Sequence, residues 1–151
     1  MAVRPGVVGS VKGAAQTIQN LHRFGAAMDK RLLQAAVEIA VKVQRTAVAS
    51  IQRGPKTGRI YGKHQASAPG EAPATDTGAL ASSVQRVDDK KTTAAVGTGL
   101  GYGRDLEFGT KNMAARPWLF PALESERKAY IQKLNKLGIE AMKSIKRGED
   151  K

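Results

Sequence analysis

Apolar residues recur at helical spacing in two long stretches of the chain. In residues 26–53 they fall on one broad face: Leu33, Ala36, Val37, Ala40, Val41, Val48 and Ile51. The opposite face is polar: Arg31, Gln34, Glu38, Lys42, Arg45 and Gln52. The second stretch repeats from Leu123 through Tyr130 and Leu137 to about residue 146. We therefore predict two amphipathic helices, the first about 42 Å long at 1.5 Å per residue.

The pattern before the first long helix is shorter. Ile18, Leu21 and Phe24 recur every three residues, which predicts a short helix over residues 14–24. Gly25 follows and weakens helical structure, so we expect a bend there. Gln44 lies inside the apolar arc of the long helix, where a buried amide needs a hydrogen-bond partner.

Between the two helices the pattern changes to that of short strands. Residues 83–87 and 92–98 are rich in Val, Thr and Ala, and the polar residues 88–91 between them suit a turn, so we predict a hairpin. Asp76 or Thr77 is expected to cap a short helical turn that ends at Leu80. The predicted fold class is α+β: a small, mostly antiparallel sheet of three to five strands, packed against a long N-terminal helix and a C-terminal helix.

Residues 54–78 contain five Gly and three Pro and no long apolar run. We predict a long extended loop, which either orders against another subunit or is a disordered insertion. Its candidate partner contacts are Lys56, Arg59, Tyr61, Lys63 and His64. At the chain ends, residues 1–13 suit a mobile arm or a short strand at residues 7–11, and residues 147–151 suit a frayed tail.

Most of the large aromatic side chains lie in one segment, residues 101–123. The segment holds the only Trp and two of the three Phe, and each such ring buries about 150 to 250 Å². We therefore expect this junction to form the centre of the core, built by Tyr102, Leu106, Phe108, Trp118, Phe120 and Leu123. Gly109 suits the end of a short helix. Pro117 and Pro121 bracket residues 118–120, where we expect a short strand.

The same segment carries a resemblance to a known family. The sequences YGRDLEFGT at residues 102–110 and RPWLFPAL at residues 116–123 resemble the closing signature of the minor tail-component and tail-completion family of long-tailed phages. Upstream, Ala72-Pro73 and DTGALASSV at residues 76–84 resemble that family's other signature. The resemblance covers residues 32–145. It departs from the family in the long insertion before Asp76 and at Trp118, where the family more often has Phe.

The resemblance implies a structural virion protein with no enzyme activity and no cofactor. Such proteins form part of the neck or tail, as a sixfold ring around the DNA channel between the head connector and the tail tube. The implied partners are copies of the same chain and the adjacent connector, head-closure, tail-terminator and tail-tube proteins. Assembly in the cytoplasm of a host bacterium follows from the same resemblance.

Composition limits the alternatives. A chain of 151 residues predicts one domain. It contains no Cys, so disulfide and thiolate chemistry are unavailable. No stretch has the length of a membrane span, and Arg4, Pro5 and Lys12 interrupt any apolar signal core. The net charge of +12 favours an acidic partner, either nucleic acid or an acidic protein surface. A basic protein that binds DNA without sequence specificity is therefore the alternative function.

Four features that suggest chemistry lack its other requirements. Asp76-Thr77-Gly78 matches the motif of retroviral-type aspartic proteases, but no apolar strand precedes it to hold the carboxylate. The glycines of residues 97–103 lack the spacing of a phosphate-binding loop. Asp105 and Glu107 are two residues apart and diverge on a helix, so they do not indicate a catalytic carboxylate pair. Glu107 is expected to pair with Arg104 or Arg116 instead. Neither His22 nor His64 has a companion at ligand spacing, which argues against a metal site.

Overall fold

The computed structural model describes residues 13–88 and 93–147. Its elements, in order, are α1 (Ala14–Arg53), β1 (Ile60–Tyr61), β2 (His64–Gln65), α2 (Ala79–Ser83), β3 (Val84–Asp88), β4 (Ala94–Thr98), α3 (Tyr102–Phe108) and α4 (Phe120–Arg147). The arm or strand expected in the first twelve residues, the turn at 89–92 and the tail at 148–151 lie outside the described residues.

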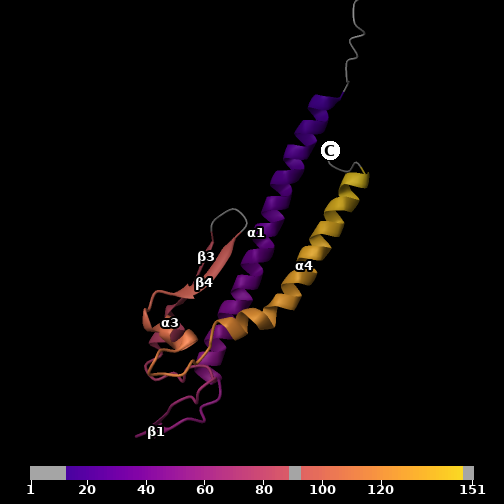
Figure 1. The fold of residues 1–151 in the computed structure, drawn as a ribbon. Coiled ribbons are helices and arrows are strands. Elements are labelled where there is room, and N and C mark those ends of the chain that lie inside the picture. The colour runs from indigo at the N-terminus through magenta and orange to yellow at the C-terminus, as the bar shows by residue number, and fades with distance from the viewer. Residues whose placement is uncertain (1–12, 89–92, 148–151) are drawn as a thin grey trace, which may run out of the picture.

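Two long helices form the frame of the molecule. α1 and α4 run side by side in opposite directions (Figure 1). With 40 and 28 residues, they are about 60 and 42 Å long at 1.5 Å per residue. All six residues of the predicted polar face of α1 are exposed. Lys133 of α4 hydrogen-bonds to Glu38 of α1 and thereby lowers the pKa of the Glu38 carboxyl. Both predicted amphipathic helices are confirmed.

The bend expected at Gly25 is wrong, because α1 continues through that residue without a break. A single glycine inside a helix costs about 1 kcal/mol relative to Ala. The hydrogen bonds of the flanking turns outweigh that cost, so the short helix over residues 14–24 is the first part of α1. It carries the exposed side chains of Ile18 and Leu21.

The α+β class is confirmed, and the strands form two antiparallel two-stranded sheets. The predicted hairpin is β3 and β4, paired from Val84 opposite Thr98 to Asp88 opposite Ala94. This hairpin packs against α1. Gln44, whose amide needed a partner, donates from Nε2 to the Val84 carbonyl at 2.9 Å and ties α1 to the start of β3.

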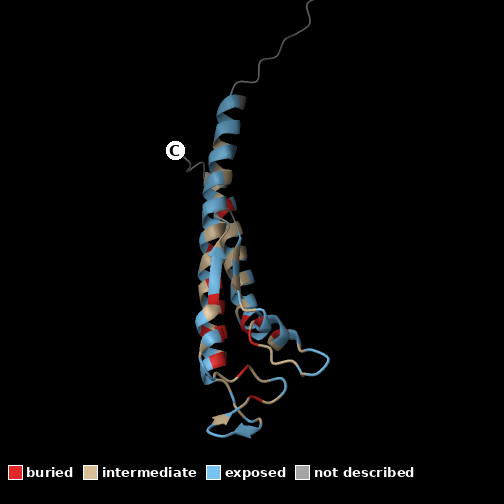
Figure 2. Cartoon of the chain, turned by 90° about the vertical axis from the view of Figure 1, so that its left-hand side faces the viewer, coloured by how far each residue is buried: buried red, intermediate tan, exposed pale blue. Residues whose placement is uncertain are grey.

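The core occupies only part of this elongated molecule. α1 contributes Ile39, Val43, Ala47 and Ile51, which recur every four residues and so share one face. Leu80, Ala81, Val84, Trp118 and Ala122 complete the buried cluster. Figure 2 shows that the buried residues lie along the middle and lower parts of the molecule, while the upper part of α1 is exposed.

Residues 54–78 contain the second sheet, a hairpin within the segment that the sequence pattern indicated as loop. β1 and β2 pair Ile60 with Gln65 and Tyr61 with His64. Gly62 has a φ of 61°, which suits the first position of a two-residue hairpin turn. Hydrogen bonds fix the base of the segment, because the Glu71 carboxylate accepts from the backbone N–H groups of Thr57 and Ala68.

Candidate interaction surface

The aromatic junction is organised by one buried carboxylate. Glu107 projects from α3 to the N-terminus of α4, where its Oε2 accepts from the backbone N–H groups of Trp118 and Leu119 at 2.8 and 2.9 Å. Its Oε1 accepts from the N–H of Phe120 at 2.8 Å. The first N–H groups of a helix have no partner within the helix, and the helix dipole favours negative charge there. Glu107 therefore caps α4 from a different element.

This arrangement corrects two expectations. Residues 118–120 do not form a strand, because the groups that would pair with a strand are taken by Glu107 and by the start of α4. Glu107 does not pair with Arg104 or Arg116. Arg116 instead donates from Nε to the Ser67 carbonyl at 3.3 Å. Sequence spacing missed the cap because α3 and α4 meet only after the chain between them folds back.

Trp118 is fixed in the core by its indole. The side chain is 2% exposed, and its Nε1 donates to the Gly103 carbonyl at 3.1 Å. A Cβ on Gly103 would lie 2.4 Å from Cγ2 of Thr98, so α3 reaches this position only with glycine there. Leu106 packs partly buried against the same cluster. These two residues occupy the core as expected.

The four other residues expected in the core are exposed. The exposed fractions are 76% for Phe108 and 59% for Phe120, and Tyr102 and Leu123 are each nearly half exposed. The reason is geometric: Glu107 and Trp118 fix the backbone so that the indole points inward, and the neighbouring rings then face away from the core. The prediction that they form the centre of the core is therefore wrong.

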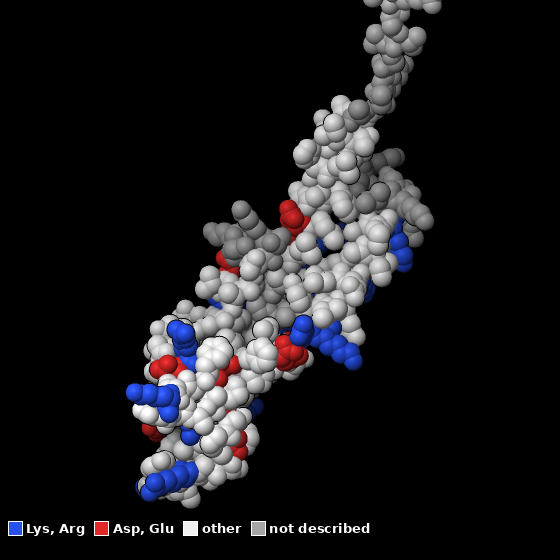
Figure 3. Space-filling view, in the orientation of Figure 1, with Lys and Arg blue, Asp and Glu red and all other residues white. Residues whose placement is uncertain are grey.

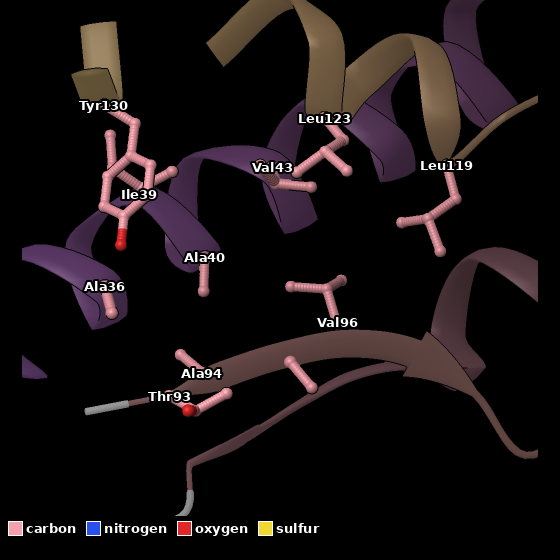
Figure 4. Close-up of a pocket in the computed structure, with 11 residues that line it drawn as sticks. Ala36, Ile39, Ala40, Val43, Thr93, Ala94, Val96, Leu119, Leu123 and Tyr130 are labelled. Atoms are coloured by element: carbon pink, nitrogen blue, oxygen red, sulfur yellow. The ribbon is translucent and has the colours of Figure 1, made fainter. Parts of the chain in front are cut away.

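Three of these exposed residues, Phe108, Phe120 and Leu123, border two hollows. One, of about 500 Å³, lies between the Gly97–Gly101 backbone, Trp118 and the side chains of Phe108 and Phe120. The other, of about 460 Å³, lies between α1, β4 and α4. In Figure 4 the side chains of Val43, Val96, Leu119 and Leu123 point toward one another across it. Leu119 and Leu123 line both hollows, so we treat the two as one apolar surface, termed the junction surface.

The predicted partner contacts lie at the end of the molecule where α1 finishes (Figure 1). The side chains of Arg59, Tyr61 and Lys63 are exposed, whereas those of Lys56 and His64 are half-buried. Arg59 stacks over the Tyr61 ring, with its guanidinium carbon 5.5 Å from the ring centre. All five residues belong to the β1–β2 hairpin or to the segment that leads into it.

The expected cap at Asp76 is wrong, and Thr77 takes part of that role. α2 follows Gly78, which has a φ of 77°. The Thr77 hydroxyl accepts from the N–H of Ala79 at 3.3 Å, whereas the exposed Asp76 carboxylate lies 3.9 Å from Nδ1 of His64. Glycine reaches this left-handed conformation without strain, so α2 starts here without a carboxylate cap.

The described part of the chain contains no cluster of three His, Asp or Glu residues arranged to hold a metal ion. None of the helices in residues 13–88 and 93–147 is both long and apolar enough to cross a bilayer. Comparisons of this chain with protein-family models, with curated proteins and with solved structures found no match.

Proposed function

We propose that this protein is a structural component of the neck or tail of a long-tailed phage, where copies form a sixfold ring around the DNA channel. The observation that carries the proposal is a coincidence of position. The segments that resemble the tail-completion family, residues 102–110 and 116–123, supply part of the junction surface, including Leu119 and Leu123, which line both hollows; α1, β4 and the Gly97–Gly101 backbone supply the rest. The proposed role of that surface is to bind protein.

Exposure of the junction aromatics supports this role. Contiguous apolar surface on a soluble protein commonly marks a protein–protein contact. Phe108 and Phe120 flank Glu107 and Trp118, whose hydrogen bonds hold the local backbone. Binding to a surface that is already ordered avoids most of the entropy cost of ordering it. The arrangement therefore suits assembly better than it suits an isolated subunit.

The sheets suggest what assembly adds. β3 pairs only with β4 among the described strands, so each has one edge without a strand partner. Open edges favour the addition of strands from another chain. Under the proposal, the three- to five-stranded sheet expected from the sequence forms when a neighbouring subunit adds a strand to the open edge of β3 or of β4. The proposed further partners are the head connector, head-closure, tail-terminator and tail-tube proteins, with assembly in the bacterial cytoplasm and location in the virion.

Mass measurement of the purified protein tests the proposal. We expect ring-sized oligomers at high concentration or on addition of purified connectors, and stronger self-association of the natural chain than of a Phe108→Ser/Phe120→Ser variant. Met142→Ser is the matched control, because Met142 is 65% exposed but lies far along α4, outside both the junction surface and the β3–β4 sheet. Monomers under all these conditions, with no binding to connectors, would contradict the proposal.

Charge supports a second candidate, non-specific DNA binding. Between Glu38 and Glu71 the chain has six Lys or Arg residues and no acidic residue. A cationic segment of this kind binds phosphates and releases counterions, so its DNA affinity falls steeply with salt. Titration of duplex DNA at two salt concentrations separates the candidates. Tight binding that weakens steeply with salt supports DNA binding, and connector binding that persists at high salt supports the structural role.

A further inference from the structure

The β1–β2 hairpin presents two apolar side chains at the tip of the molecule. Ile60 is 65% exposed and Tyr61 is 59% exposed. Neighbouring residues of a strand point to opposite faces, so this narrow hairpin is apolar on both sides. Its base is held by Glu71, which accepts from the hydroxyl and the N–H of Thr57 and the N–H of Ala68. A fixed base with an apolar tip is suited to insertion into a hollow on another molecule.

The junction surface has the complementary shape and polarity. Its two hollows, of about 500 and 460 Å³, meet at Leu119 and Leu123 and are open to solvent. Aliphatic and alanine side chains, together with glycine backbone, make up most of their walls. The hollows are thus able to receive an aliphatic and an aromatic side chain on either side of a shared ridge.

The hairpin is basic, and the junction surface offers it one carboxylate, that of Glu126. Glu107 is taken up by the cap of α4, and Glu124 pairs with Arg127. The exposed Arg104 also lines one hollow, so the complementary charge lies at the Glu126 side of the surface. Glu126 lies three residues after Leu123 on α4, so the two side chains share one face of that helix. Glu126 is half-buried and forms no ion pair with the residues that the structure describes. Figure 3 shows both acidic and basic side chains exposed over the lower half of the molecule.

We infer that the β1–β2 hairpin of one copy docks into the junction surface of a second copy. Ile60 and Tyr61 enter the hollows on either side of Leu119 and Leu123, and Arg59 or Lys63 pairs with Glu126. The contact joins two different surfaces of the same chain, so it is head-to-tail, and it closes into a ring when the rotation between copies allows. This inference rests on the proposed function for the ring and adds which surfaces meet.

Disulfide trapping between two single-cysteine variants tests the contact, because the natural chain has no Cys. Tyr61→Cys and Phe120→Cys proteins are purified separately, mixed at high concentration and oxidised with diamide. We expect a cross-linked dimer in the mixture and little in either protein alone. A mixture of Tyr61→Cys with Met142→Cys is the control, since Met142 is equally accessible at 65% exposure but lies far along α4.

Charge reversal supplies the second arm. Arg59→Glu/Lys63→Glu and Glu126→Arg are each expected to reduce trapping several-fold, and a mixture that pairs the reversed hairpin with the reversed junction is expected to restore it. Tyr61→Cys that cross-links to itself would show a symmetric contact and overturn the inference. Two other outcomes would overturn it as well, if no cross-link to a second copy forms. One is a cross-link between Tyr61→Cys and an added connector protein; the other is protection of the position 61 thiol from oxidation by added DNA.

The outcomes also separate this inference from the proposed function. Ring-sized oligomers that form without the cross-link between positions 61 and 120 would refute hairpin docking and leave the ring standing. Absence of both the cross-link and any oligomer, with or without connectors, would refute both.

Discussion

Replacing Glu107 by Ala is expected to destabilise the whole protein. The carboxylate accepts three backbone N–H groups at 2.8 to 2.9 Å at the start of α4, and the residue is 8% exposed. Its removal leaves three donors poorly solvated, and each buried donor left unpaired costs about 1–3 kcal/mol. Partial entry of water lowers that sum, so we expect a loss of about 4 kcal/mol in the free energy of unfolding. Such a loss is a large fraction of the stability of an ordinary domain.

Glu107→Gln should cost less, about 2 kcal/mol, because one amide oxygen still accepts while the amide nitrogen faces an N–H group. Asp105→Asn is the matched control on the same helix. Asp105 is exposed, and surface substitutions usually change stability by less than about 0.5 kcal/mol. Urea unfolding followed by circular dichroism gives the free energies, and the single Trp reports by fluorescence whether the junction stays packed. Glu107→Ala within about 1 kcal/mol of the natural chain would refute the capping role.

Three further predictions concern other parts of the chain. Trp118→Ala should cost about 3–5 kcal/mol in urea unfolding, as a large core truncation, and a small loss would show that the indole is not part of the core. Hydrogen bonds from Thr57 and Ala68 lower the pKa of Glu71 from its ordinary value of 4.5. That contribution to stability is therefore complete above about pH 4.5 and is lost as the pH falls through the lower folded-state pKa. Protection factors for amide exchange in residues 54–78, which are corrected for the intrinsic exchange rate at each pH, should fall in that range, and Glu71→Gln should remove this change. Asp76→Ala should change stability by less than about 0.5 kcal/mol, because Asp76 caps no helix, and a loss above 1 kcal/mol would contradict the structure.

The sequence was most informative where the spacing of apolar residues along one segment decides its structure. α1 and α4 were predictable because their apolar residues follow the helical repeat, and the β3–β4 hairpin because a polar turn separates two β-prone runs. The need of Gln44 for a partner was also predictable, since burial of an amide without one is costly. Gly25 was misjudged because the propensity of one residue does not decide the path of a 40-residue helix.

The junction was less predictable, because its geometry depends on contacts between separate elements. Aromatic residues are usually assigned to the core by their size. Here Trp118 alone among the three junction rings of Phe and Trp is buried, because its indole N–H reaches the Gly103 carbonyl while Glu107 takes the neighbouring N–H groups. A pattern read along the chain does not show that a carboxylate on α3 meets the N–H groups of residues 118–120. The exposed surface that results was therefore missed, although its residues had been singled out.

We propose that the junction surface binds protein within a ring in the neck or tail of a virion. Electron cryo-microscopy of the neck of a virion that carries this protein would show directly what covers this surface. We predict a ring of six copies around the DNA channel, with Phe108 and Phe120 of every copy covered by a neighbouring protein. A virion whose neck and tail lack this protein would contradict the proposal. So would a ring of copies in which the side chains of Phe108 and Phe120 face open solvent.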